Sequence, residues 1–499
     1  MISSISVGSI IGIAIAAAFV LCVLILCIRA NVKVKKQEQR QVIAFDDLDE
    51  KGSVKHLQEA IRFKTITMAN EYKDNSQPFL DMRKWMLESY PYLVKGSELT
   101  VINGYSLVFC VKGSDPSLKP ACFLSHQDVV PADPKGWSCD PFSGELASDG
   151  YVYGRGALDM KNHLISVLEG IEYWLRKGKR FKRTLYICFG HDEEVIDSEE
   201  GAPKIVEYFK EKGITFEYVL DEGGSIIDGK QLFAKGFVAA VGATEKGAAD
   251  IEVTVKKEGG HSSRPQYPSA NGIMGKVMNK IETHQMPTRL TPLLKSTFTT
   301  LASSTNPVFK FFLGNVDVFS PLLRFILAKA NPVTNALIRT TMATTRLWGS
   351  DARNTIANEV TVNVNVRLLS GDTIEDVLKH LNKILKKWIK KGEIEIKVNS
   401  CFSASPESSC DNETFDVLAQ SIKETFENTT VLPYVFLGGT DSKYYTQVCD
   451  KVYRFGPILV GLEDEHRFHG IDERISPEKL NKMVQFMATY IKNSCIIDE

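Results

Sequence analysis

The 499-residue sequence has almost no excess charge of either sign, because 60 lysines and arginines face 61 aspartates and glutamates. Such a balance gives no bulk field that would attract nucleic acid. The sequence also lacks a basic helix and a ladder of aromatic residues, which are features that would indicate a nucleic-acid-binding surface. Internal repeats and long low-complexity tracts are absent too. With 43% hydrophobic and 24% charged residues, the composition is that of a globular protein long enough for two or three domains.

The ten cysteines have no close-spaced pattern of the zinc-ribbon kind. Cys22 and Cys27 fall within an apolar N-terminal segment and need no redox explanation. Among the other eight, Cys401 and Cys410 are placed to bridge a loop. Free buried thiols are an equal alternative.

Charge is wholly missing between Val7 and Ile28, a stretch long enough to cross a bilayer as a helix. No polar face marks it as a buried core helix. A cleaved signal peptide is the rival interpretation, but the apolar run is longer than usual and no basic residue precedes it. We therefore predict a transmembrane helix over 7–28, followed by a charged linker over 29–51.

Two features of the sequence disagree about the orientation of this helix in the membrane. Five basic residues follow it and none precedes it, which by the positive-inside rule places the body in the cytoplasm; they are Arg29, Lys33, Lys35, Lys36 and Arg40. Asn412-Glu-Thr and Asn428-Thr-Thr, however, are glycosylation sequons, which function only on the lumenal side. We predict a single-pass protein with a lumenal or extracellular body; secretion after signal cleavage is the alternative.

Short apolar strands alternate with amphipathic helices after residue 52, which predicts an α/β fold with a largely parallel, mixed sheet and helices on both faces. From Ala249 the strands instead alternate between apolar and polar residues, as in a sheet with one wet face. A β-α-β-β-α-β set then predicts an inserted α+β domain for lid or dimer contacts. The expected domains are a catalytic domain over 52–243 and 399–499, interrupted by the inserted domain over 244–398.

The segment from Leu290 to Trp348 is unusually apolar and contains Phe311-Phe312. One interpretation is that it packs helices onto the inserted domain or forms a subunit interface. The other is a hydrophobic lid beside the active site, apolar as ligand pockets usually are.

Polar side chains gather where the predicted strands end. His126 and Asp128 follow the apolar run from Ala121 to Leu124, and an alternating strand places both on one side. Carboxyl ends of parallel strands meet at one edge of a sheet, so we expect further groups there, namely Asp159, Glu193, Glu194, Asp221 and His469. Two histidines with several carboxylates suit zinc.

One bridging carboxylate would let this set hold two ions. Asp159 lies in a Gly-rich turn before a helix and suits that place. Glu193 and Glu194 are adjacent and cannot point the same way, so one can bind metal while the other acts as a base. Taken alone, residues 192–200 are also compatible with an acidic surface loop.

Six segments in order resemble the metallopeptidase family of aminoacylases, carboxypeptidase S and N-fatty-acyl-amino-acid synthase/hydrolases. The resemblance runs from about residue 50 to the C-terminus. Its motifs are His126-Gln-Asp128, Gly154-Arg-Gly-Ala-Leu-Asp159-Met-Lys, His191-Asp-Glu-Glu194, Leu220-Asp221-Glu-Gly-Gly, Gly259-Gly-His261-Ser-Ser-Arg-Pro and His469-Gly-Ile-Asp-Glu.

The resemblance implies a role for each metal-site residue. His126 and Asp221 would hold one zinc, Glu194 and His469 would hold the other, and Asp159 would bridge them. Glu193 would be the general base, and Asp128 would orient His126.

For the substrate, the resemblance implies that His261 stabilises the oxyanion. Members of the family often supply this histidine from a second subunit, so a homodimer is expected. Arg367 would pair with the substrate carboxylate, as its guanidinium fork allows. Asn354 and Ser442 are weaker candidates for substrate contact.

Together these features predict a membrane-tethered, dinuclear zinc amidohydrolase whose small-molecule substrates are N-acyl amino acids, with fatty-acyl rather than acetyl chains. It would cleave, and also form, their amide bond. A carboxypeptidase acting on short peptides is the alternative within the class. A catalytically silent binding protein on the same fold is the alternative from another class, which the intact ligand set disfavours.

Overall fold

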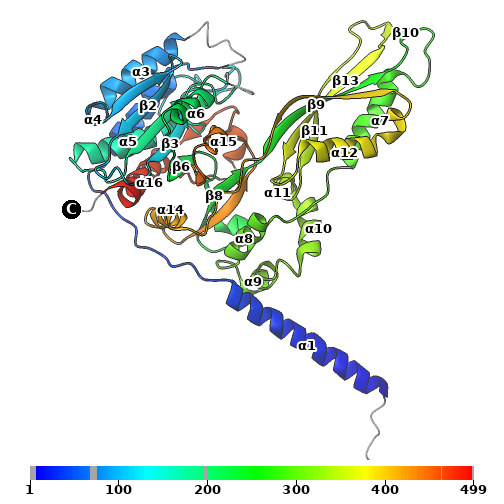
Figure 1. The fold of residues 1–499 in the computed structure, drawn as a ribbon, viewed down its shortest axis with the longest axis horizontal. Coiled ribbons are helices and arrows are strands. Elements are labelled where there is room, and N and C mark those ends of the chain that lie inside the picture. The colour runs from blue at the N-terminus through cyan, green and yellow to red at the C-terminus, as the bar shows by residue number, and fades with distance from the viewer. Residues whose placement is uncertain (1–6, 68–75, 196–198, 462, 497–499) are drawn as a thin grey trace, which may run out of the picture.

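The computed structural model describes residues 7–67, 76–195, 199–461 and 463–496. Figure 1 shows a main domain built on a large sheet, an inserted domain that extends away from it, and helix α1 (Val7–Lys33) projecting from the body. The predicted α/β class, with a mixed sheet and an inserted α+β domain, is confirmed.

The main sheet has nine strands in the order β1-β2-β5-β3-β6-β16-β8-β15, with β7 beside β8. Strand β3 lies between β5 and β6 and runs parallel to both. Strand β2 is antiparallel to both β1 and β5, and β16 is antiparallel to β8, so the sheet is mixed. The strands are β1 (Glu98–Ile102), β2 (Ser106–Val111), β3 (Ala121–His126), β5 (Leu185–Gly190), β6 (Tyr218–Asp221), β7 (Ile226–Asp228), β8 (Phe237–Glu245), β15 (Thr429–Phe436) and β16 (Val452–Arg454).

Both faces of this sheet are covered, so every residue of β3 is buried. Phe123 packs into the core that α2, α5, α14 and α16 build on one face. Cys122 and Leu124 pack into a second core with α6 and α15 on the other. A strand buried on both faces reads as a continuous apolar run. The helices of this domain are α2 (Glu50–Arg62), α3 (Gln77–Ser89), α4 (Pro91–Gly96), α5 (Lys161–Arg176), α6 (Ala202–Glu211), α14 (Glu413–Lys423), α15 (Ser442–Tyr445) and α16 (Pro477–Cys495).

The inserted domain is a four-stranded antiparallel sheet in the order β11-β13-β9-β14, with α7 and α12 packed on its apolar face. A short pair, β10 with β12, lies at its tip (Figure 1). This sheet begins at Gly247 and ends at Phe402. The elements are β9 (Gly247–Lys256), β10 (Gly260–His261), α7 (Ala270–Thr283), β11 (Thr341–Trp348), β12 (Thr355–Ile356), β13 (Glu359–Leu368), α12 (Ile374–Ile384), α13 (Lys386–Ile389) and β14 (Ile394–Phe402).

The apolar segment from Leu290 to Trp348 divides between two places. Its last part is strand β11, which the sequence analysis missed and which pairs with β13 over seven positions. Its first part forms helices α8–α11, of which α8 packs on β15 and Thr297 donates to the carbonyl of Pro433. The helices are α8 (Pro292–Leu301), α9 (Pro307–Gly314), α10 (Ser320–Ala330) and α11 (Pro332–Leu337).

Helices α8–α10 are therefore not a lid over the predicted site. They lie against edge strand β15, which is three strands away from β6 in the sheet order, or about 14 Å at the usual strand spacing. Phe311 and Phe312 pack on each other and on Phe319. The packing interpretation of this segment holds, but on the main domain.

The segment after α1 is an ordered strap along the main domain. The Gln37 side chain exchanges hydrogen bonds with both backbone groups of Val431, and Ile43 donates its amide to the carbonyl of Glu424. Phe45 packs edge-on against the ring of Trp174. Residues predicted as a linker thus fix where α1 leaves the body.

All ten cysteines lie in the described part of the chain, and each is a free thiol. The predicted bridge between Cys401 and Cys410 is not formed, and the alternative of free thiols holds. Cys122 and Cys188, on neighbouring strands, have sulfur atoms 3.6 Å apart within a core.

Candidate active site

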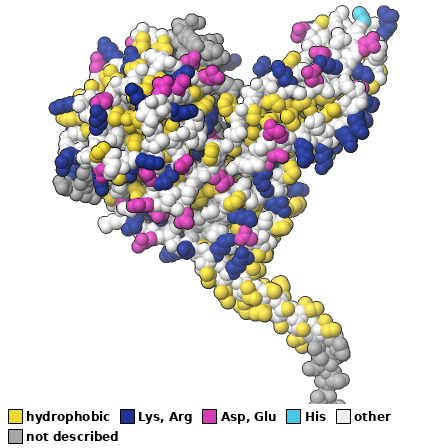
Figure 2. Space-filling model, in the orientation of Figure 1, with side chains coloured by type: hydrophobic (Ala, Val, Ile, Leu, Met, Phe, Trp, Pro, Cys, Tyr) yellow, Lys and Arg dark blue, Asp and Glu magenta, His cyan; other side chains and the backbone are white. Residues whose placement is uncertain are grey.

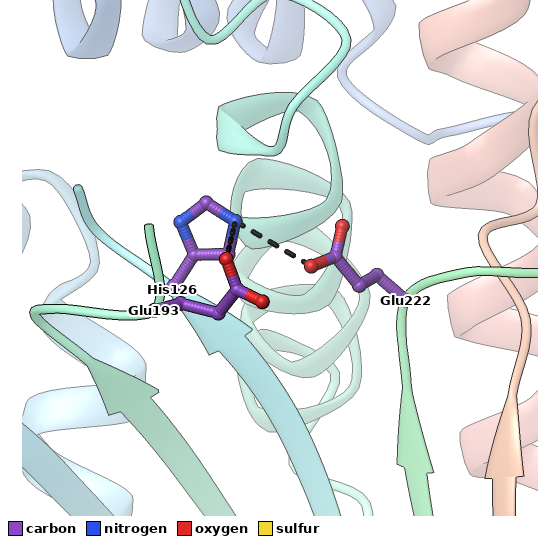
Figure 3. Close-up of side chains that lie close together, drawn as sticks. All are labelled: His126, Glu193 and Glu222. Atoms are coloured by element: carbon purple, nitrogen blue, oxygen red, sulfur yellow. Dashed lines mark ion pairs between the residues drawn. The ribbon is translucent and has the colours of Figure 1, made fainter. Parts of the chain in front are cut away.

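The predicted site lies where three neighbouring strands end. His126 is the last residue of β3, which lies between β5 and β6. Glu193 follows the end of β5, and Glu222 follows the end of β6. Figure 3 shows the side chains of His126, Glu193 and Glu222 turned toward one another above these strands.

His126 is buried and faces acidic groups on its Nε2 side. This nitrogen lies 3.3 Å from Oδ1 of Asp159, 3.5 Å from Oε1 of Glu222 and 4.0 Å from Oε2 of Glu193. Its Nδ1 lies 2.9 Å from the backbone carbonyl oxygen of Asp128 and 3.4 Å from the Asp128 carboxylate. An Nδ1–H donated to that carbonyl leaves Nε2 free to bind a metal.

The predicted ligand Asp221 ends the neighbouring strand β6. Its carboxylate accepts the amides of Glu222 and Ser442, both at 2.9 Å, so it supports the turn. The next side chain, Glu222, faces His126 instead. Gly224 holds this turn tightly to β8, since a Cβ there would lie 1.9 Å from a backbone oxygen. The sequence Leu220-Asp221-Glu-Gly-Gly contains both acids, and their side chains point in different directions at the strand end.

Asp159 lies between the two histidines. Its Oδ1 faces His126, while its Oδ2 is 3.1 Å from Nε2 of His469, which also lies 3.1 Å from Glu194. Hydrogen bonds with Asp159 and Glu194 raise the pKa of His469 to about 10. Asp159 thus presents one carboxylate oxygen to each histidine.

Asp128 holds the loop that carries both glutamates. Its carboxylate oxygens accept the backbone amides of Glu193 at 3.2 Å and Glu194 at 3.1 Å, together with the hydroxyl of Thr67 at 2.5 Å. Burial raises the pKa of Asp128, but the interaction with His126 outweighs it and keeps the pKa below its usual value. Asp128 therefore positions three side chains of the site: His126, Glu193 and Glu194.

Glu473 is a positioning residue that the sequence analysis missed, although it ends the motif that begins with His469. Its buried carboxylate accepts the amides of Gly156, Leu158 and Asp159 at 2.7–3.0 Å. It also pairs with Arg155 at 2.6 Å.

Arg155 in turn donates to the carbonyls of His469 and Gly470. One buried ion pair therefore ties the loop of Asp159 to the loop of His469. The signal available in the sequence was the position of Glu473, an acid four residues after the candidate ligand His469 in the same motif.

The acidic groups crowd one another. Burial raises the pKa of Glu193 well above its usual range, raises that of Glu194, and raises that of Glu222 to about 8, with neighbouring carboxylates adding to each effect. A divalent cation would offset this repulsion. His191 and Asp192 beside them are buried, which argues against an acidic surface loop, while residues 196–198 lie outside the described part.

Two sets of donor atoms lie close enough to hold a metal ion. One consists of His126, Glu193 and Glu222, and the other of His126, Asp159 and Glu194. Imidazole nitrogen and carboxylate oxygen are ligands that zinc accepts. The described residues thus fit a metal centre, with His469 adjoining the second set.

The predicted substrate residues lie in three different places. His261 and Asn354 are neighbours at the exposed tip of the inserted domain, where His261 pairs with Thr355. Among the described residues, His261 has no contact with the main domain. Arg367 lies half-buried near the hinge end of β13, opposite Ala248.

Ser442 is fully buried, which fits support better than the predicted contact with substrate. Its hydroxyl lies 2.6 Å from that of Thr440, and its amide holds Asp221. The predicted substrate set is therefore not assembled around the metal site within one chain.

Comparison with known proteins places this geometry in a family context. The sequence profile of peptidase family M20/M25/M40 matches residues 122–493. The N-fatty-acyl-amino acid synthase/hydrolase PM20D1 of Xenopus tropicalis is 34% identical, over 98% of this chain and 96% of that protein.

The probable carboxypeptidase S-like 2 of Dictyostelium discoideum is 32% identical, over 93% of this chain and 89% of that protein. Among solved structures, an M20 family metallo-carboxypeptidase, Sso-CP2 from Sulfolobus solfataricus, superposes with a TM-score of 0.64 at 16% identity. The superposition covers 88% of this chain and 98% of the Sso-CP2 chain. At 16% identity, the similarity shows a shared fold and nothing more.

Proposed function

Because this chain belongs to peptidase family M20/M25/M40, we propose that it is a zinc-dependent amidohydrolase that cleaves, and also forms, the amide bond of N-fatty-acyl amino acids. The observation that carries the proposal is Asp159 between His126 and His469, with Glu193 beside them. The metallopeptidase class is shown by the family. The fatty-acyl substrate is supported by similarity to the synthase/hydrolases.

We further propose two zinc ions per chain. His126 and Glu222 would hold one, Glu194 and His469 the other, and Asp159 would contribute an oxygen to each. When bound, zinc would act as a Lewis acid toward the amide carbonyl and lower the pKa of the attacking water.

Glu193 is the proposed general base. It takes a proton from the water and passes it to the leaving nitrogen, so the amide C–N bond breaks and a carboxylate and an amine are produced. The hydrogen bond from its backbone amide to Asp128 holds the backbone at Glu193. In the synthetic direction the same carboxyl group returns the proton. Glu193 needs a raised proton affinity for this role, and burial supplies it.

The carboxypeptidase alternative is favoured by the similarity to carboxypeptidase S-like 2. Both reactions need a free substrate carboxylate, for which Arg367 remains the proposed partner. The two functions differ on the acyl side, where one substrate carries an alkyl chain and the other an amino acid.

A substrate series separates the two. N-acyl-phenylalanines from acetyl to long-chain acyl would be compared with dipeptides ending in phenylalanine, using the zinc-loaded full chain. Each buried methylene contributes about 0.8 kcal/mol, so kcat/KM should rise steeply with chain length. The Glu193→Gln variant is the background control. A flat profile, or preference for dipeptides, would favour the carboxypeptidase.

We also propose that α1 is a retained membrane anchor with the body lumenal or extracellular. Residues Ile11–Lys33 are long and apolar enough to cross a membrane. The C-terminal end of α1 contacts the body, which a cleaved signal peptide would not do: Asn315 donates to the carbonyl of Leu26, and Arg29 and Lys33 pair with Asp317.

Those contacts give Arg29 and Lys33 a structural reason to follow the apolar segment, which weakens the case for a cytoplasmic body. Of the two sequons, Asn428 is exposed, whereas Asn412 caps α14 and donates its Nδ2 to Ser409 and Tyr453. Protease protection in sealed vesicles tests the topology. Digestion of the body from the cytoplasmic side would contradict it.

A further inference from the structure

Helix α10 exposes an apolar face. Leu322, Phe325 and Ile326 recur at the spacing of one helical stripe, and Val318 extends this stripe before the helix begins. Phe325 is 62% exposed. An exposed stripe of this kind marks an interaction surface.

The opposite side of α10 is apolar as well. Leu323 and Leu327 pack against a core cluster that includes Leu294 and Ile338. A helix at a water-facing surface has one apolar face and one polar face. With its inner face already used for folding, the outer stripe of α10 has no partner among the described residues.

This stripe lies beside the exit of α1 from the body. The carbonyl of Leu26 accepts from Asn315, and Gly314 packs on Ala30 so closely that a Cβ would meet it at 3.0 Å. Asp317 pairs with Arg29 and Lys33 one residue before the stripe begins. The stripe therefore starts at the level of the last two turns of α1.

Two attachments fix this geometry. Contacts between α1 and α9 hold the helix end, and the strap holds the following residues through Gln37 and Ile43. Figure 1 shows α1 leaving the body next to α9, and Figure 2 shows hydrophobic side chains along this projecting helix. A bilayer crossed by α1 would meet α10 without any movement of the body.

Basic side chains lie on α10 itself and on the neighbouring segments of the chain. Lys329 ends α10 and lies 5.0 Å from the ring of Phe325, and Lys310 lies on α9. Lys35 and Lys36 are exposed just beyond α1. Apolar residues flanked by lysines are typical of a helix in the headgroup region of an anionic bilayer.

We propose that the stripe formed by Val318, Leu322, Phe325 and Ile326 is a membrane-contact surface, called the seat below. It inserts at the boundary between headgroups and acyl chains of the bilayer that α1 crosses. This inference rests on the proposed anchor and not on the proposed reaction. Its function is to hold the body at one tilt on the lipid surface. The occupant is lipid rather than a second copy, because Leu323 of α10 shares a core cluster with Val34 at the end of α1, which places the stripe near the segment that crosses the bilayer.

The test places a photoreactive benzoylphenylalanine at Phe325 in the full chain, reconstituted in nanodiscs of phosphatidylcholine and phosphatidylserine. A second variant carries it at Leu322. The matched control carries it at Tyr92, an exposed aromatic residue on α4. After irradiation, mass spectrometry should find at least about tenfold more lipid adduct at 325 and 322 than at 92, as expected for a side chain within the acyl boundary.

Equal, low lipid labelling at all three positions would overturn the seat, and cross-linked chain dimers at 325 would assign the stripe to a second copy. Carbonate extraction of cell membranes separates the anchor from the seat. Release of the chain would refute the anchor and the seat together, whereas retention without lipid adducts would refute the seat alone. None of these readouts depends on enzymatic activity.

Discussion

The strand ends of the main domain and the tip of the inserted domain carry the two halves of the predicted chemistry, and they differ in how they are held. At the strand ends, His126 is buried and Asp128 and Glu473 accept several backbone amides around it. At the tip, His261 is exposed, and its ring accepts only the amide of Ser263 among the bonds of the described residues.

This difference indicates which half one chain completes. Metal ligation needs side chains fixed to within a fraction of an ångström, and buried acceptors supply that precision. A residue that reaches its target only after domain closure or from a second subunit has no partner to fix it in a single chain. The predictions below test each half and then the hinge between them.

The largest effect is expected for Glu193→Gln. Removing a general base typically lowers kcat by about 100- to 10,000-fold. Because the amide keeps the shape of the carboxylate, both zinc ions and the fold should remain. Metal content by mass spectrometry and turnover of a long-chain N-acyl-phenylalanine check this. Turnover like that of the unmodified enzyme would show that the base is assigned to the wrong residue.

His261→Ala should lower kcat by about 100- to 1,000-fold, as expected for loss of an oxyanion donor. If a partner subunit supplies this histidine, mixing His261→Ala with Glu193→Gln subunits should restore activity to about a quarter of the unmodified level, since half the dimers hold one intact site. Mixing Glu193→Gln with His469→Ala is the control, because both changes fall in the main domain. No recovery in the first mixture would place His261 in its own chain's site.

Glu222→Gln and Asp221→Asn should differ. We expect Glu222→Gln to lose one zinc per chain, since its carboxylate faces His126. Asp221→Asn removes only the acceptor that holds the turn, and outer contacts of this kind typically change metal affinity by about 10- to 100-fold. Zinc titration of the two proteins compares them directly. If Asp221→Asn loses a zinc and Glu222→Gln does not, then Asp221 is the ligand, as the sequence predicted.

The smallest effect concerns Lys246 at the hinge, between β8 and β9. Burial lowers its pKa to about 7, aided by the charge of Arg367, and its amine donates to the carbonyls of Ala336 and Arg339. In the unfolded chain a lysine titrates near about 10.4.

Between these two values the unfolded chain binds a proton that the folded chain lacks. The free energy of unfolding should therefore rise with pH by up to about 1.4 kcal/mol per pH unit. Lys246→Met should lose this slope in urea unfolding between pH 7.5 and 9.5, whereas Lys397→Met, on the exposed side of β14, should keep it. Parallel curves for Lys246→Met and the unmodified protein would contradict the buried amine.

Periodicity and motif order predicted much of the fold. Strand β13 (Glu359–Leu368) has the apolar–polar alternation predicted for the inserted sheet, and the main domain alternates strands with helices as predicted. Strand β11 was missed because most of its side chains are exposed and its pairing contains a bulge, so it lacks the apolar–polar alternation of β13. The helices α8–α10 were associated with the site because an apolar composition does not reveal which surface a helix packs against.

The sequence by itself determined the ligand types, the order of the motifs and the strand ends on which they lie, because these depend on local chain geometry and residue chemistry. Only the tertiary structure decided that Glu222 rather than Asp221 faces His126, that Glu473 joins two loops, and that α9 packs against α1. Each of these depends on which surfaces meet across many residues of separation. Local propensities carry no information about such contacts.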